Sequence, residues 1–244
     1  DHPRTVRRPR TAGGDRVIDG VVSGRAATGP LGILGGTFDP VHYGHLRLAE
    51  EARMALGLAA VRWIPAGLPP HRPLPRTSAE HRLSMLRLAL TGNPAFSLDD
   101  GEALSAAPSY SVATLERLRA ELGPQRPLVL LLGVDAFLGL GSWHRWRELF
   151  GLAHLAVATR PGYALAAEQL EPALAGEFRE RQSHSAASLI HAPAGHILPF
   201  PIAALDISAT RLRETLQAGG SARYLLPDPV LDYIAGHNLY SNDS

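Results

Sequence analysis

The chain of 244 residues contains no cysteine and no lysine, and aromatic residues make up only 6% of it. Without cysteine, disulfide bonds and thiolate chemistry are excluded, which fits a protein of the cytoplasm. All 24 basic side chains are therefore arginine, which indicates a compositional bias of the genome rather than a choice made at one site. The net charge of +1 gives no reason to expect nucleic acid as a partner.

Long apolar runs are also absent. No run approaches the roughly 20 residues that a membrane-spanning helix requires, and no signal-peptide pattern is visible. We therefore expect a cytoplasmic protein without membrane contact.

Short apolar runs near residues 31, 61, 96, 128, 154 and 198 alternate with helical patterns. This alternation predicts an α/β fold, a single Rossmann-like domain with a parallel sheet flanked by helices. The domain is expected over residues 31–244. Residues 1–30 scatter arginines among small and polar residues, which predicts a flexible Arg-rich N-terminal extension. Residues 164–194 are expected to form one helix followed by a variable loop.

The segment Gly35–His45 joins a small-residue turn to two histidines, between an apolar strand pattern and a helix pattern that ends near Leu56. Gly35 and Gly36 can adopt positive φ and let backbone N–H groups approach an anion, and the helix N-terminus adds further donors. His42 and His45 are predicted to share one face of the first helical turn. The pattern predicts phosphate binding. The alternatives are a capping histidine beside a solvated one, and a metal site, which ranks lower because zinc needs three or four ligands.

A second motif lies at Ile207–Arg213. Ser208 is a good N-cap, and the helix that follows is expected to close at Gly219 and Gly220. Alone, this pattern also describes an ordinary capped surface helix.

The two motifs resemble the His-x-Gly-His and Ile-Ser-[Ser/Ala]-Thr-x-x-Arg signatures of a nucleotidyltransferase superfamily. Together with Pro69–Arg72, Pro108–Ser111 and Gly141–Trp143, they resemble the family of bacterial nicotinate-nucleotide adenylyltransferases across residues 31–240. This resemblance implies transfer of the adenylyl group of ATP to nicotinate mononucleotide in NAD biosynthesis, with release of pyrophosphate. It also implies Mg²⁺ held mainly by substrate phosphates, with no metal ligands from the protein, and it is compatible with a homo-oligomer.

The resemblance implies roles for individual residues. Those implied to be catalytic, by stabilising the α-phosphate and the leaving pyrophosphate, are His42, His45 and Arg213. Those implied to bind ATP or its phosphates are Gly35, Gly36, Thr37, Phe38, Gly133, Asp135, Arg160, Ile207, Ser208 and Thr210. Those implied to bind nicotinate mononucleotide are Asp39, His71, Arg72, Ser109, Tyr110, Ser111, Trp143 and His144.

Other interpretations of single residues stay open. Trp143, expected to stack on the pyridine ring, is also compatible with core packing, and Asp135, expected at the ATP ribose, is also compatible with a helix N-cap. His71 and Arg72 are also compatible with incidental charge on a proline-rich loop. The chain departs from the family at Ala103–Ser105, where relatives often show Leu-x-Arg, and has Ser111 where threonine is usual.

Three competing functions remain. A sister nucleotidyltransferase would share both phosphate motifs but lack the acceptor segments, and a nucleotide sensor would have lost His42, His45 or Arg213. A nucleic-acid-binding protein would depend on the arginines of residues 1–30.

Overall fold

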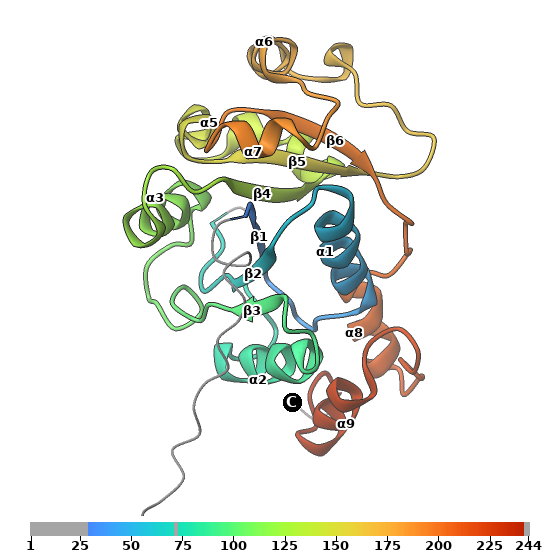
Figure 1. The fold of residues 1–244 in the computed structure, drawn as a ribbon. Helices are drawn as coiled ribbons and strands as arrows, with labels where there is room; N and C mark the ends of the chain where they lie inside the picture. The colour runs from blue at the N-terminus through green and yellow to red at the C-terminus, as the bar shows by residue number, and fades with distance from the viewer. Residues whose placement is uncertain (1–28, 71–72, 242–244) are drawn as a thin grey trace, which may run out of the picture.

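The computed structural model describes residues 29–70 and 73–241. The predicted N-terminal extension lies almost entirely outside the described residues, and so do His71 and Arg72. The described chain forms a parallel sheet in the order β3-β2-β1-β4-β5-β6 (Figure 1). Its strands are β1 (Leu31–Gly36), β2 (Ala60–Pro65), β3 (Phe96–Leu98), β4 (Leu128–Gly133), β5 (His154–Thr159) and β6 (Ile197–Pro201).

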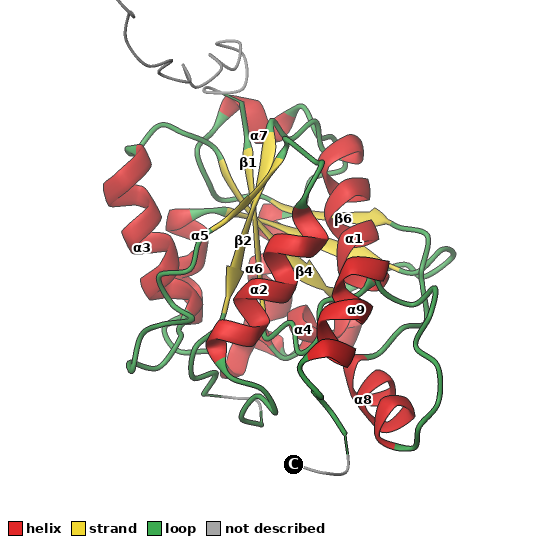
Figure 2. Ribbon diagram, turned by 90° about the horizontal axis from the view of Figure 1, so that it is seen from below, coloured by secondary structure: helices red, strands yellow, loops and turns green. Residues whose placement is uncertain are grey.

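Helices cover both faces of this sheet (Figure 2). The α-helices are α1 (Tyr43–Ala55), α2 (Ala79–Leu90), α3 (Ser111–Leu122), α4 (Val134–Leu138), α5 (Leu149–Leu152), α6 (Pro172–Arg181), α7 (Ser188–His191), α8 (Ala209–Gln217) and α9 (Asp228–Gly236). Short 3₁₀ turns η1 (Leu140–Ser142), η2 (Trp146–Glu148) and η3 (Ala167–Gln169) complete the described elements.

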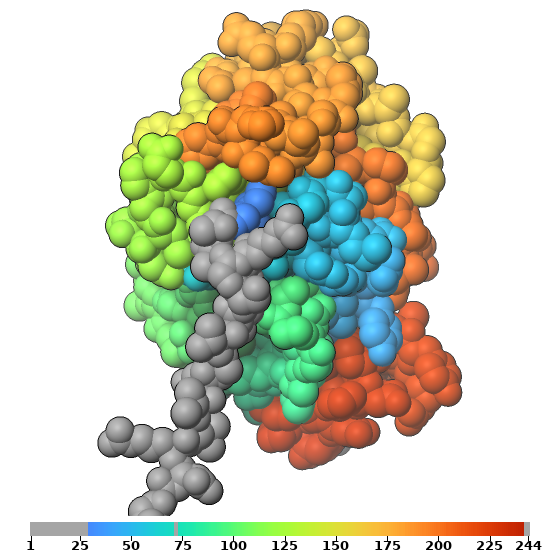
Figure 3. Space-filling model, viewed as in Figure 1, coloured from blue at the N-terminus to red at the C-terminus, as the bar shows by residue number. Residues whose placement is uncertain are grey.

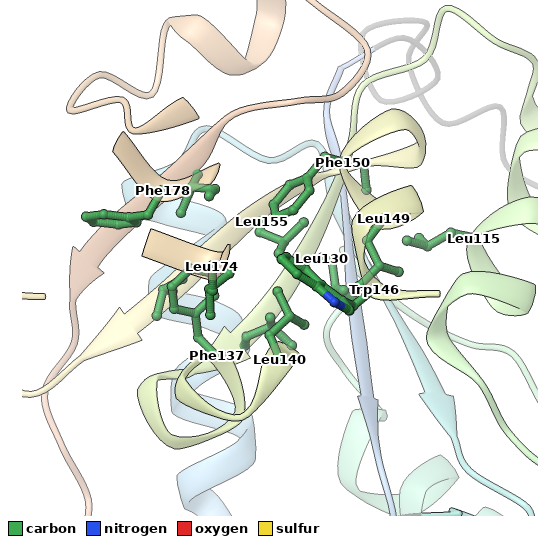
Figure 4. Close-up of a cluster of buried hydrophobic side chains, with 14 of the residues drawn as sticks. Leu115, Leu130, Phe137, Leu140, Trp146, Leu149, Phe150, Leu155, Leu174 and Phe178 are labelled. Carbon is green, nitrogen blue, oxygen red and sulfur yellow. The ribbon is translucent and has the colours of Figure 1, made fainter. Parts of the chain in front are cut away.

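The apolar residues of the strands divide by alternation into two cores. In β4, Leu128, Leu130 and Leu132 face one cluster of buried side chains, whereas Val129 and Leu131 face the other. Successive residues of a strand point to opposite faces, so a continuous apolar run is required where both faces are covered. The first cluster lies under α3 to α6 (Figure 4), and the second lies under α1, α2, α8 and α9.

The predicted fold class is confirmed, and all six strands lie where the sequence places them. Residues 164–194 contain α6 and a loop, as expected, and also η3 and α7. Helix α2 has no counterpart in the sequence-based prediction. In the described part of the chain, no helix is both long enough and apolar enough to cross a bilayer.

We expect Leu155→Ala to destabilise the protein by about 2–5 kcal/mol, because Leu155 is fully buried on β5, which has a strand on each side, and its truncation leaves a cavity. Urea unfolding would measure the change. Leu104→Ala is the matched control, since Leu104 is 59% exposed and should change stability by less than about 0.5 kcal/mol. Equal losses in the two variants would contradict the assignment of the core.

Candidate active site

The carboxyl ends of β1 and β4 meet where the order of the sheet reverses. From β1 the chain adds β2 and β3 on one side, and from β4 it adds β5 and β6 on the other. Open parallel sheets bind ligands at such a switch point. A cavity of about 320 Å³ lies here, and its lining includes Gly35, Gly36 and Thr37 from the end of β1 and Asp135 from α4.

The two glycines at the end of β1 differ from the prediction in their backbone. Both continue the strand, and the residue of positive φ in this loop is Phe38, at +52°. Glycine is required at position 36 for space, because a Cβ there would lie 2.9 Å from the Phe38 ring. At position 35 the nearest atom to an added Cβ is 3.9 Å away, so the missing side chain leaves the cavity open.

The two histidines lie together at the start of α1. Their rings stack with centroids 3.7 Å apart, although His42 is the N-cap of the helix and not a residue of its first turn. The His42 Nδ1 accepts a hydrogen bond from the Gly44 N–H at 3.1 Å, and the His45 Nδ1 accepts one from the His42 N–H at 3.3 Å. Since an accepting nitrogen carries no proton in a neutral imidazole, both rings hold their proton on Nε2.

Burial keeps His42 neutral. Only 5% of the residue is exposed, and desolvation of the charged ring lowers its pKa from 6.5 to about 4. A neutral imidazole that caps a helix and still presents Nε2–H is therefore a hydrogen-bond donor at neutral pH. The capping interpretation of His42 is confirmed, and it leaves the Nε2–H as a donor, so the phosphate-binding role stays a prediction.

The second motif comes within contact distance of the first. A Cβ added at Gly44 would lie 2.9 Å from the His42 ring and 3.6 Å from the carbonyl oxygen of Ile207. Ser208 caps α8 as predicted, accepting from the Arg211 N–H at 3.4 Å. The α8 N-terminus thus lies beside the end of the segment 37–42, which we call the histidine loop. Backbone donors and imidazoles are therefore close together here.

Arg213 extends from α8 to the histidine loop. Its Nη1 donates to the Asp39 carbonyl oxygen at 2.8 Å, and its Nη2 donates to the Thr210 hydroxyl at 3.2 Å. The guanidinium is half-buried. These two bonds fix the direction of the side chain and place its positive charge next to the loop.

The opposite wall of the cavity comes from the start of α3. Ser109, Tyr110 and Ser111 line it, and the N-cap Tyr110 gives no side-chain acceptor to the first turn of α3 as this part of the chain is described. The Ser109 hydroxyl accepts from the Gly67 N–H at 3.0 Å, which joins this loop to the segment after β2. The start of α3 therefore has no side-chain cap from Tyr110, and helix N-termini in general favour anions.

Trp143 and His144 complete the acceptor wall. Trp143 lines the cavity and also packs against the core under α3 to α6, so the packing interpretation is confirmed and the stacking role stays a prediction. The His144 and Tyr110 rings lie 4.5 Å apart between centroids. This pair forms an aromatic rim to the cavity.

Three further predicted residues do not line the cavity, and a fourth, Asp135, does. The Asp39 carboxylate, predicted to bind the acceptor nucleotide, is 3% exposed and accepts hydrogen bonds from Arg76, Thr77 and Tyr240. Asp135 lines the cavity from within α4, whose N-cap is Gly133, so the N-cap interpretation of Asp135 is wrong. The predicted phosphate ligands Arg160 and Thr210 are exposed residues, at the end of β5 and on α8.

Sequence reasoning missed two charged groups at the site. Glu102 lines the cavity, hydrogen-bonds Thr114, and has its pKa raised by desolvation. Arg82, buried in α2, donates through Nη1 to the carbonyl oxygens of Thr37 and Ala66 at 2.8 and 2.7 Å. In the sequence, Arg82 stands among apolar residues with helical spacing. An amphipathic surface helix has the same pattern, so the sequence did not indicate that this arginine is buried.

Comparison with known proteins shows a family for this chain. The family model described as cytidylyltransferase-like matches residues 33–215. A protein of Dechloromonas aromatica described as a probable nicotinate-nucleotide adenylyltransferase is 57% identical over 213 residues, which cover 87% of this chain and 98% of that protein. A protein of Halorhodospira halophila with the same description is 51% identical over 210 residues, which cover 86% and 94%.

Among solved structures, the nicotinic acid mononucleotide adenylyltransferase of Plasmodium falciparum, complexed with NaAD, superposes with a TM-score of 0.64. It is 18% identical and the match covers 87% of this chain and 97% of that one. At this identity the structural likeness shows that the two chains share a fold, and nothing more.

We expect the His42 ring to titrate near pH 4 in the folded protein, because burial disfavours the charged form. NMR of the ring C–H signals would measure the midpoint, with the unfolded chain, near 6.5, as reference. Since the folded pKa is the lower one, the protonated ring favours the unfolded state, and His42 costs stability as the pH falls from about 6.5 toward 4. A folded-state midpoint near 6.5 would contradict this account.

We expect Gly44→Ala to destabilise the protein by about 1–2 kcal/mol although alanine is the better helix former, since the added Cβ displaces the capping His42 ring. Urea unfolding tests this. Gly151→Ala is the matched control, because nothing lies within 4 Å of its added Cβ. A Gly44→Ala variant as stable as the control would show that the ring is not held as described.

Proposed function

Because this chain belongs to the cytidylyltransferase-like family and, within it, to the nicotinate-nucleotide adenylyltransferases, we propose that it adenylates nicotinate mononucleotide reversibly. ATP supplies the adenylyl group, and the products are nicotinate adenine dinucleotide and pyrophosphate. The chain is a nucleotidyltransferase of NAD biosynthesis. The observation that carries the proposal is the pair of imidazoles with both Nδ1 atoms occupied, set beside the α8 N-terminus and after the loop that follows β1.

The reaction needs no enzyme nucleophile. The 5′-phosphate of nicotinate mononucleotide attacks the α-phosphorus of ATP, the new P–O bond forms, and the bond to the pyrophosphate oxygen breaks. Catalysis then depends on positioning and on donors aimed at the developing charge. His42 and His45 donate from Nε2 to oxygens of the α-phosphate and the leaving group. Arg213 and the α8 N-terminus hold the β- and γ-phosphates.

The acceptor ring occupies the cavity between α3 and Trp143. In this proposal Trp143 stacks on the pyridine ring, and backbone donors at Ser111 and His144 receive its carboxylate. The uncapped start of α3 supports this role, since N–H groups at a helix N-terminus favour an anion over a neutral amide. The nicotinate form is therefore the expected acceptor.

Mg²⁺ accompanies ATP in this proposal. Over residues 29–70 and 73–241, no three histidine or carboxylate side chains gather in a group that could hold a metal ion. The Asp39 carboxylate near the loop is used by other protein groups. Phosphate oxygens and water are therefore the ligands that fit, and the ion would shield the charge of the triphosphate.

We expect His45→Ala to lower kcat by about 10²–10³-fold, because a donor aimed at transition-state charge is removed. The assay measures pyrophosphate release and dinucleotide formation from ATP with either nicotinate or nicotinamide mononucleotide. His191→Ala is the matched control, because His191 is exposed at the end of α7.

Rapid turnover of the acid form by the wild type, lost in His45→Ala and kept in His191→Ala, supports the proposal. A wild type that releases no pyrophosphate with either acceptor would contradict it, and turnover with another phosphate acceptor alone would favour a sister nucleotidyltransferase.

A further inference from the structure

The buried carboxylate of Asp39 joins segments that are far apart in the sequence. Oδ2 accepts from the backbone N–H of Arg76 at 2.6 Å. Oδ1 accepts from the hydroxyl of Thr77 at 2.7 Å and from that of Tyr240 at 2.5 Å. Both oxygens are thus engaged, by the residues that precede α2 and by the C-terminal segment.

The backbone of the same residue holds Arg213. The Asp39 carbonyl oxygen accepts from Nη1 of Arg213, and His42 follows Asp39 closely in the chain. The bonds that hold the carboxylate therefore anchor the residue whose carbonyl orients the guanidinium. Tyr240 and Arg213 also line the same surface hollow of about 460 Å³, so the two side chains lie in the same part of the molecule.

The C-terminal segment bends to bring Tyr240 to this position. Asn238 and Tyr240 have φ of +51° and +61°, a conformation that costs free energy for residues other than glycine. The phenol is half-buried, and burial together with the negative charge of Asp39 raises the pKa of Tyr240, so the hydroxyl keeps the proton that it donates. Helix α9, which leads into this segment, packs against α2 (Figure 3).

We propose that Tyr240 is a positioning residue for adenylyl transfer. It acts through Asp39 to hold the histidine loop and Arg213 in a fixed position relative to each other. This inference rests on the proposed function. Tyr240 is remote in this network from Ser109–Ser111 and Trp143, which line the acceptor cavity. Loss of its hydroxyl therefore impairs the step at the phosphates and leaves binding of the acceptor intact.

The test is Tyr240→Phe, which removes the hydroxyl and keeps the ring. The expected kcat is at least about tenfold lower, since small misplacements of catalytic groups have large effects on rate, with the KM for nicotinate mononucleotide within about twofold of wild type. The matched control is Tyr233→Phe, because the Tyr233 hydroxyl also joins α9 to α2, at 2.9 Å from His81 Nδ1, without touching Asp39. Its kinetic constants should match those of the wild type.

A second pair of variants tests the same carboxylate from the other side. Thr77→Val should lower kcat with KM unchanged, and Thr77→Ser, which keeps a hydroxyl for Asp39, should restore it. Assays are run where each variant is fully folded by circular dichroism. Equal kcat values for Tyr240→Phe and Tyr233→Phe would overturn the inference, and so would a rise in KM without a loss of kcat.

A readout without turnover separates this inference from the proposed function. The ring C–H NMR signals of His42 and His45 should shift in Tyr240→Phe and stay in place in Tyr233→Phe. If the wild type shows no adenylyl transfer, the proposed function fails, and the ring signals still report whether Tyr240 positions the loop. Unchanged ring signals in Tyr240→Phe would contradict the positioning role.

Discussion

The reversal of strand order between β1 and β4 is the constraint on which the site depends. Connections between parallel strands are right-handed as a rule. Those that lead from β1 toward β3 therefore place their helices on one face of the sheet, and those that lead from β4 toward β6 place them on the other face. The helices therefore diverge at the carboxyl ends of β1 and β4 and leave the cavity between them. The loop that leads to the two histidines follows one of these strands and α4 follows the other, so residues from both halves of the sheet lie around one cavity.

Beyond β1, hydrogen bonds at the start of α1 also orient the two histidines to which we assign catalysis. The Gly44 and His42 N–H groups would be unpaired donors at a helix start, and each bonds the Nδ1 of a histidine. The same bonds set the tautomer of both rings and leave the proton on Nε2. Burial of His42 removes its charge, so the site offers neutral donors, and Arg213 supplies the positive charge.

The strands and the paired motifs could be predicted from the sequence because their signals are local. Apolar runs such as Leu128–Leu132 mark strands covered on both faces, and His42, His45 and Ser208 stand at fixed positions beside helix starts. The use of Gly36 could not be predicted, because its cause is the ring of Phe38 folded back over it. The partners of Asp39 include Tyr240, more than 200 positions away, and no local pattern encodes such a pairing.

Arg82 shows why the two halves of the site keep a fixed relation. Its guanidinium is 2% exposed, its Nε has no partner within the described part of the chain, and burial lowers its pKa. Such a group costs stability unless its remaining donors are well used. Nη1 donates to the carbonyl of Thr37, which follows β1, and to that of Ala66, which follows β2. In-line transfer requires the acceptor phosphate and the α-phosphate to be aligned closely, and a small misalignment slows the reaction greatly. A buried arginine that bonds both walls meets this requirement, whereas an apolar side chain of the same size would fill the volume without fixing either carbonyl.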